Sequence, residues 1–181
     1  MLKGVACHPH YTWSFFARSF GDQDNFGRIL FEDKSSPQLL QNGDFAGPVK
    51  GRWLGRWYTS RKPPKKDKTT FVFGGESLQV PGGETLAQYF NFKPDTEYSL
   101  TFWLKIADKT QFDVRIDEGN DYVTKCPRRK IVGPRKWMRQ EYRFKTHARK
   151  PTRQPYLRFQ AFGEGGAVWL DRAKLSEVNP K

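Results

Sequence analysis

The sequence predicts an all-β protein built as a two-sheet antiparallel sandwich. Residues 76–107 contain three successive runs in which apolar and polar residues alternate, joined by short turns at 81–83 and 93–96. The 15 Phe, 7 Tyr and 6 Trp residues suit strands better than helices, and no window keeps a helical period. Such strands place one face in a core and leave the other for solvent or ligand.

The first 37 residues are predicted to form an aromatic-rich hairpin extension. Tyr11, Trp13 and Phe15 alternate with other residues, and a polar turn at 21–25 separates them from a second short strand at 28–31. We therefore divide the chain into an N-terminal extension, residues 1–37, and a sandwich domain, residues 38–181. The extension packs either on its own sandwich or on a neighbouring chain.

The sandwich is expected to begin with a strand at 38–45 that ends in an Asn42-Gly43 turn. A strand follows across 53–58, whereas 61–68 should be an exposed basic loop, because two prolines there remove backbone donors. A strand opens at Phe71, later strands are expected at 112–116, 137–145, 156–162 and 167–175, and 125–136 should be a second basic loop. The best alternating rows predict these core residues: Leu100, Phe102, Leu104, Val114, Ile116, Phe144, Leu157 and Phe159.

The chain is strongly basic, with a formal net charge of +13. Two segments, 50–68 and 125–158, hold 21 of the 32 Lys and Arg residues. This charge favours an anionic partner such as an acidic glycan or an acidic protein, and a solvated basic surface is the plain alternative. The residues expected to meet an anionic partner are Lys62, Lys65, Lys66, Arg128, Arg129 and Lys130.

Other classes of function find little support in the sequence. No Ser-His-Asp or Cys-His order and no phosphate-binding loop is present, and the acidic pair Asp117-Glu118 sits in turn-like sequence, where solvated carboxylates are the rule. We therefore do not expect an enzyme. Basic and aromatic residues interleave in 53–68, but no recognisable nucleic-acid-binding motif accompanies them.

Neither a signal peptide nor a transmembrane segment can be read in this chain, and membrane insertion is not expected. The two cysteines are too few for a disulfide scaffold. The location stays undetermined, with a virion or the extracellular space expected if the chain is an excised module.

The order of the segments resembles the carbohydrate-binding modules of families 4, 9 and 22, which belong to the galactose-binding-like jelly rolls. The resemblance covers residues 38–178. It rests on the segments LLQNGDF at 39–45, SLQV at 77–80, TLAQYF at 85–90, PDTEYSLTFWLK at 94–105, a strand at Trp137 and AVWLD at 167–171. It implies a non-catalytic jelly roll that binds a glycan in a cleft or at its loops.

The resemblance also implies a structural calcium ion between the first and last strands. Family members often use an acidic residue just after the Asn-Gly-x-Phe turn together with an aspartate of the closing strand. Asp171 matches the second, whereas Ala46 stands at the first position and Asp44 is the nearest substitute. No other cofactor is expected.

Glycan binding requires flat aromatic faces for the C–H surfaces of sugar rings and fixed polar groups for the hydroxyls. Tyr89 and Trp103 both lie out of phase with their apolar neighbours, so we expect this pair to mark the ligand face. The further aromatic candidates are Trp53, Trp57, Tyr58 and Trp137, and the polar candidates are Gln88, Arg115 and Arg139.

Two functions remain open at this point. The first is a non-catalytic module that recognises a glycan, and the charge of the chain favours an acidic one. The second is a structural subunit of a large assembly, such as a phage virion or tail, that docks on protein neighbours through its basic loops and aromatic extension.

Overall fold

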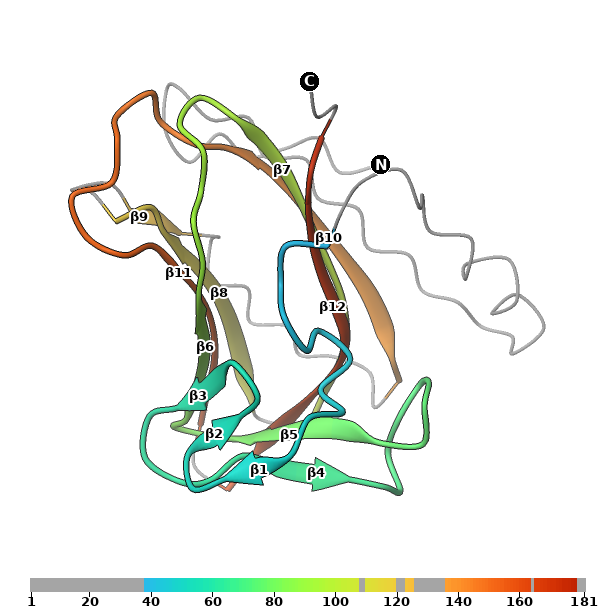
Figure 1. The fold of residues 1–181 in the computed structure, drawn as a ribbon. Helices are drawn as coiled ribbons and strands as arrows, with labels where there is room; N and C mark the ends of the chain where they lie inside the picture. The colour runs from blue at the N-terminus through green and yellow to red at the C-terminus, as the bar shows by residue number, and fades with distance from the viewer. Residues whose placement is uncertain (1–37, 108–109, 120–122, 126–135, 164, 179–181) are drawn as a thin grey trace.

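The computed structural model describes residues 38–107, 110–119, 123–125, 136–163 and 165–178, and these residues form an all-β structure (Figure 1). No part of this described region is a helix long and apolar enough to cross a membrane. The predicted hairpin within residues 1–37 lies outside the described residues, as do Arg128, Arg129 and Lys130. The strands are β1 (Val49–Lys50), β2 (Trp53–Leu54), β3 (Trp57–Thr59), β4 (Lys65–Asp67), β5 (Ser77–Pro81), β6 (Thr85–Tyr89), β7 (Glu97–Ile106), β8 (Gln111–Asp117), β9 (Val123–Lys125), β10 (Met138–Lys145), β11 (Tyr156–Phe162) and β12 (Ala167–Glu177).

The strands form two antiparallel sheets that face each other. The seven-stranded sheet has the order β1-β2-β3-β6-β11-β8-β9, and the five-stranded sheet has the order β10-β7-β12-β5-β4. From β5 to β8 the chain changes sheet at every step, and β10, β11 and β12 again alternate between the two. In Figure 1 the seven-stranded sheet lies on the left and strands β7, β10 and β12 lie on the right. The predicted two-sheet jelly-roll sandwich is confirmed.

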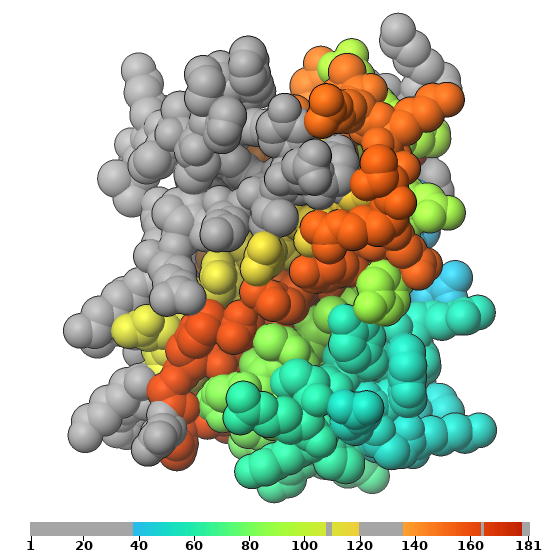
Figure 2. Space-filling view, turned by 90° about the vertical axis from the view of Figure 1, so that its left-hand side faces the viewer, coloured from blue at the N-terminus to red at the C-terminus, as the bar shows by residue number. Residues whose placement is uncertain are grey.

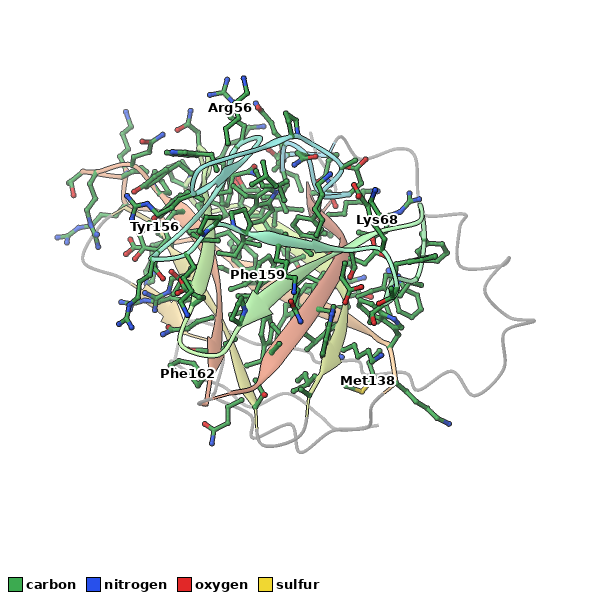
Figure 3. The ribbon with its side chains drawn as sticks, turned by 90° about the horizontal axis from the view of Figure 1, so that it is seen from below. Arg56, Lys68, Met138, Tyr156, Phe159 and Phe162 are labelled. Atoms are coloured by element: carbon green, nitrogen blue, oxygen red, sulfur yellow. The ribbon has the colours of Figure 1, made fainter. Side chains whose placement is uncertain are left out.

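The core between the sheets is aromatic and follows the predicted alternation. All eight predicted core residues are buried. Phe159 of β11 packs on Phe102 of β7, with 4.9 Å between ring centroids, and so links the two sheets. In Figure 3 Phe159 lies in the interior of the molecule, whereas Tyr156 of the same strand lies toward its edge.

The first described segment is a loop, and the expected strand at 38–45 is therefore wrong. Residues 41–44 form turns, and Phe45 and Asn42 have positive φ angles of 59° and 54°. The loop lies against β12, where the Ala173 N–H donates to the Gly43 carbonyl at 2.7 Å. A Cβ atom at Gly43 would lie 2.0 Å from the Ala173 carbonyl oxygen, so only glycine allows this approach.

Three further expectations about strands differ from the structure. Residues 53–58 form a hairpin of β2 and β3, because Gly55 takes a positive φ of 59° and reverses the chain. The expected basic loop at 61–68 contains β4, which pairs with β5 at the edge of the five-stranded sheet. Pro63 and Pro64 directly precede β4, so they remove no backbone donor from its hydrogen bonds to β5. The strand expected to open at Phe71 is wrong, because residues 71–73 form a loop that precedes β5.

Replacing Phe102 with Ala should lower the free energy of unfolding by about 3–5 kcal/mol, because the ring is fully buried and packs against both sheets. Urea denaturation followed by tryptophan fluorescence measures this change. Phe71→Ala is the matched control, since Phe71 is exposed, and it should change stability by no more than about 0.5 kcal/mol. Equal losses in both variants would contradict the assignment of the core.

Candidate ligand-binding site

The outer face of the seven-stranded sheet carries a row of side chains that crosses five neighbouring strands. Successive register partners are Trp53 and Tyr58, Tyr58 and Ala87, Ala87 and Arg158, and Arg158 and Arg115. Register partners point to the same side of a sheet. Because the neighbours of these residues along each strand fill the core, the row faces outward. Figure 2 shows this face, on which β11 runs diagonally between β8 and β6.

One end of the row is an aromatic surface. The rings of Tyr58 and Tyr89 are stacked, with 5.5 Å between centroids and 15° between planes. Trp53 lies 5.5 Å from Tyr58 on one side, and Tyr156 lies 5.9 Å from Tyr89 on the other. Trp53 is 50% exposed and Tyr89 is 43% exposed. The four rings, which we call the aromatic platform, offer a continuous surface of ring faces and edges.

Hydrogen bonding and partial burial fix the centre of the aromatic platform. The Tyr58 hydroxyl donates to the Tyr89 hydroxyl at 3.4 Å. Burial, followed by this hydrogen bond, raises the pKa of Tyr58 above its ordinary value, and burial raises the pKa of Tyr156 as well. Both phenols are therefore neutral at physiological pH and can donate or accept hydrogen bonds.

The other end of the row is polar and charged. Arg158 of β11 and Arg115 of β8 are half-buried register partners. The Nε atom of each guanidinium is buried and has no hydrogen-bond partner within the part of the chain that the structure describes. Asp117, farther along β8, is committed elsewhere: its Oδ2 accepts from Arg153 at 3.0 Å and its Oδ1 from the Gly119 N–H at 2.9 Å.

Three of the residues selected from the sequence for ligand binding meet on this face, namely Tyr89, Trp53 and Arg115. Tyr58, also named from the sequence, completes the platform. Tyr156 and Arg158 were missed. The alternation of 156–162 contained the signal, because both residues are out of phase with the core residues Leu157 and Phe159.

Two other selected residues, Trp57 and Gln88, lie beneath this face and are buried. The Trp57 indole N–H donates to the Asn42 carbonyl at 3.0 Å. The Gln88 amide accepts from the Gln41 N–H at 2.8 Å and donates to the Gln41 carbonyl at 2.7 Å. Both side chains thus hold the first loop against the sheet, which positions the strands that carry the platform.

The expectation that Tyr89 and Trp103 share a face is wrong. Tyr89 belongs to β6 of the seven-stranded sheet, whereas Trp103 belongs to β7 of the five-stranded sheet. Trp103 is buried and packs edge-on against Phe73, at 5.8 Å between centroids. Arg139 lies in β10 of the five-stranded sheet, and Trp137 directly precedes that strand.

The basic residues expected to meet an anionic partner have different environments. Lys62 and Lys65 are exposed. Lys66 is half-buried, and its ammonium group contacts Glu76 Oε1 at 2.5 Å and the Ala46 carbonyl at 2.9 Å. Lys66 therefore has an internal role as an ion-pair partner.

The acidic pair Asp117-Glu118, expected to be solvated, is buried. Glu118 Oε2 accepts from the His147 N–H at 2.9 Å, and Asp117 pairs with Arg153 as described above. Both carboxylates therefore hold the loops at the end of the sheet.

The residues near the first loop do not fit the calcium ion that the resemblance implies. Asp171 is buried, and its Oδ2 accepts from the N–H groups of Val72 and Phe73, both at 3.0 Å. Burial raises the pKa of Asp171, which opposes its ionisation. The Ala46 carbonyl faces the Lys66 ammonium. No cluster of three or more His, Cys, Asp or Glu residues able to hold a metal occurs among the described residues.

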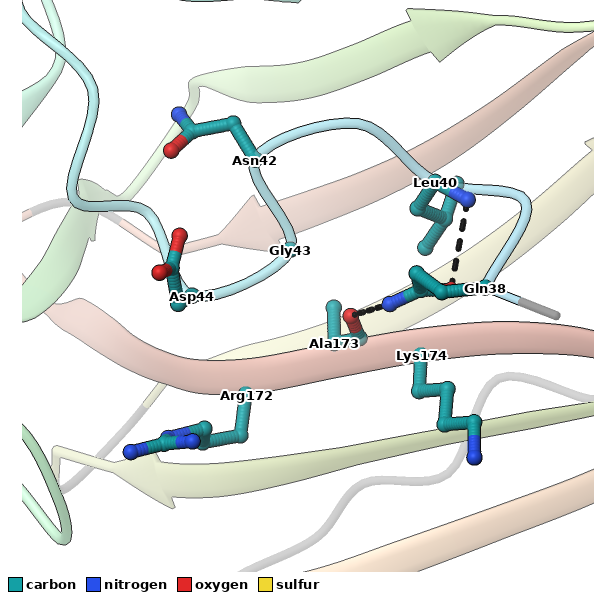
Figure 4. A pocket seen from close by; sticks show the side chains of 8 residues that line it. All are labelled: Gln38, Leu40, Asn42, Gly43, Asp44, Arg172, Ala173 and Lys174. Atoms are coloured by element: carbon teal, nitrogen blue, oxygen red, sulfur yellow. Dashed lines mark hydrogen bonds between the residues drawn. The ribbon is translucent and has the colours of Figure 1, made fainter. Parts of the chain in front are cut away.

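Asp44 lines a shallow pocket of about 340 Å³ between the first loop and β12 (Figure 4). Its carboxylate accepts from the Ala46 N–H at 3.2 Å. Arg172 and Lys174 line the same pocket, and their positive charge disfavours a bound cation. Lys66 instead places a positive charge at the Ala46 carbonyl, at the position where the resemblance implies an acidic ligand of calcium.

A second polar link joins β4 to β12. Asp67 Oδ2 accepts from the Trp169 indole N–H at 2.7 Å, and Oδ1 accepts from the hydroxyl and the N–H of Thr69 at 2.7 and 2.8 Å. These hydrogen bonds, with the Thr69 hydroxyl foremost, lower the pKa of Asp67 from 3.8 to about 2. The ionised carboxylate thus stabilises the edge strand.

Solved structures with the same fold include several carbohydrate-binding modules. A family 61 module in complex with β-1,4-galactotriose is 16% identical, with a TM-score of 0.60, and the match covers 79% of this chain and 100% of that module. The CBM22-1 xylan-binding domain from Paenibacillus barcinonensis is 12% identical, with a TM-score of 0.55, and the match covers 75% of this chain and 98% of that domain. The fold is therefore the jelly roll of the carbohydrate-binding-module type.

The same fold also occurs in an enzyme. A cyclase from Fischerella sp. is 12% identical, with a TM-score of 0.58, and the match covers 81% of this chain and 98% of the cyclase. No protein-family model and no curated protein sequence matches the chain. At such identities the likeness concerns the fold alone, and function has to be argued from the site.

Because the Lys66 ammonium stands near the expected calcium position, we predict that the stability of the protein does not depend on calcium. Lys66→Met should lower the free energy of unfolding by about 1–2 kcal/mol, because Glu76 then loses its partner in a half-buried position. Lys65→Met is the matched control and should change stability by no more than about 0.5 kcal/mol. The melting temperature of the wild type should not change with added calcium or EDTA. A rise in melting temperature with calcium would show that the residues near the first loop do bind this ion.

The lowered pKa of Asp67 predicts a specific loss of stability in acid. A lowered pKa contributes stability that is present above about pH 4 and is lost as the pH falls through about 2. The difference in unfolding free energy between the wild type and Asp67→Asn, measured by denaturation from pH 6 to pH 2, should therefore shrink toward pH 2. A difference that stays constant over this range would show that the ionised form of Asp67 contributes nothing.

Proposed function

We propose that this chain is a non-catalytic glycan-binding module that holds its ligand on the outer face of the seven-stranded sheet. The observation that carries the proposal is the aromatic platform, together with the two arginines that follow it in the same cross-strand row. Aromatic faces pack against the C–H surfaces of sugar rings, and guanidinium and phenol groups bind hydroxyls.

The exposure of the platform supports a binding role. Among the described residues the large exposed apolar side chains are Val49, Trp53, Phe71 and Tyr89, and two of these four belong to the platform. Keeping such rings in water forgoes the stability that their burial would provide, so a cluster of them on a regular sheet favours a ligand surface.

The spacing of the carboxylates on β8 argues against hydrolysis of glycosides. Asp113 and Asp117 lie four residues apart on β8, which separates them by about 13 Å along the strand. Paired carboxylates that hydrolyse glycosides lie about 5–9.5 Å apart. Asp117 is moreover occupied by Arg153.

The formal charge of +13 favours a ligand of negative charge in general. The second function left open by the sequence, a structural subunit of a virion or tail, depends on residues 1–37 and 128–130, which lie outside the described part. Among the described residues only the exposed Lys62 and Lys65 favour a structural subunit. That function therefore stays an alternative.

The platform can be tested with a panel that includes β-1,4-galactotriose, xylan oligosaccharides and uronate oligosaccharides. Tyr89→Ala and Trp53→Ala should each weaken binding of the recognised glycan by about tenfold or more in isothermal titration calorimetry, because a stacking surface is lost. The control Phe71→Ala removes an equally exposed ring elsewhere and should leave affinity unchanged. Failure of the whole panel to bind, or equal effects in all three variants, would refute the proposed function.

A further inference from the structure

We propose that Arg115 and Arg158 form a subsite for the carboxylate of a uronic acid residue, so that the recognised glycan is acidic at a defined position. This inference rests on the proposed function and adds the chemical class of the ligand. It is carried by the pairing of the two arginines across β8 and β11 and by the lack of any partner for their Nε atoms in the described chain.

The arginine pair is costly for the fold. Like charges directly opposite each other on neighbouring strands destabilise a sheet. Within the described residues neither Arg115 nor Arg158 forms an ion pair with an acidic side chain. An arginine pair that has no ion-pair partner in the described part of the chain is expected where a ligand supplies the negative charge.

The position of the pair suits a sugar that also contacts the platform. The positive charge of Arg158 acts on the phenols of Tyr58 and Tyr156, partly offsetting the rise in their pKa. Ala87 separates Tyr58 from Arg158 in the row and leaves that position without a long side chain. Three strand spacings, about 14 Å, separate Tyr58 from Arg115, so stacking and charge recognition can act on one oligosaccharide.

A carboxylate fits better than a densely charged polyanion. The planar guanidinium group forms two parallel hydrogen bonds to a carboxylate. Asp113 and Asp117 lie two residues before and after Arg115 on β8 and therefore face the same side. A ligand with charges along its whole length, such as a sulfated glycan or a nucleic acid strand, would have to pass the carboxylate of Asp113 beside Arg115, whereas a single carboxylate would not.

The test compares uronate oligosaccharides with their own carboxyl-reduced forms, which keep the ring and lose the charge. Oligogalacturonate, oligomannuronate and glucuronoxylan oligosaccharides are titrated by calorimetry into the full chain. At least one should bind about tenfold or more tightly than its reduced form. Arg158→Gln and Arg115→Gln should each remove most of this advantage and change the affinity for the reduced form by less than about twofold.

Charge-conserving and remote variants separate the subsite from general attraction. Arg158→Lys keeps the charge but loses the two-pronged geometry, so it should lose more than half of the advantage for the uronate. Lys65→Gln removes an exposed charge on the other sheet and should leave binding unchanged. Arg158→Gln should also leave the melting temperature equal or higher, because it relieves the repulsion across the strands. A purely structural arginine would lower it.

The outcomes distinguish the two proposals. If a neutral glycan binds and Tyr89→Ala weakens it, while carboxyl reduction and Arg158→Gln have no effect, the subsite is refuted and the proposed function stands. If no glycan binds, both are refuted. Tighter binding of heparin or single-stranded DNA than of every uronate, weakened equally by Lys65→Gln and Arg158→Gln, would refute the subsite in favour of unspecific attraction of polyanions.

Discussion

The contact between Phe159 and the aromatic residues around it is the interaction on which the rest of the structure depends. Phe159 packs on Phe102 of the opposite sheet and on Trp57 and Phe112 of its own, with centroid distances of 4.9, 5.7 and 5.9 Å. It therefore joins β3, β7, β8 and β11 through one side chain. Because its strand alternates strictly, burying Phe159 and Leu157 obliges Tyr156 and Arg158 to face outward. The candidate site is thus a direct consequence of core packing.

The same constraint extends across the sheet. The register of β3, β6, β11 and β8 is set by residues that fill the core, namely Trp57, Leu86, Phe159 and Val114. A slip of one residue in any strand would bury its outward side chains and break the row from Trp53 to Arg115. The rigidity of the core therefore preorganises the outer face, which lowers the ordering cost that a ligand has to meet.

Sequence patterns were sufficient for the sandwich and its core, because alternation is a local property of each strand. They were insufficient for the assignment of strands to sheets. Tyr89 and Trp103 are both out of phase with their core neighbours, yet alternation does not state which sheet a strand joins.

Trp57 lies in a basic, polar segment and is nevertheless buried, because the first loop folds over it and the Asn42 carbonyl accepts its indole N–H. Lys66 looked like part of a solvated charge run, and only its contacts with Ala46 and Glu76, distant in sequence, give it an internal role. Such contacts depend on tertiary structure and have no local signature.

The ion pair of Lys66 has a consequence for the conditions in which the protein can work. A metal ion exchanges with the surroundings and is lost when a competing chelator is present. The ammonium group of Lys66 is covalently part of the chain, so its contacts with Ala46 and Glu76 do not require a divalent ion. Polymers rich in carboxylates are themselves ligands for calcium. A link made by a side-chain cation is retained at the surface of such a polymer, whereas a calcium-dependent link would compete with the polymer for the ion.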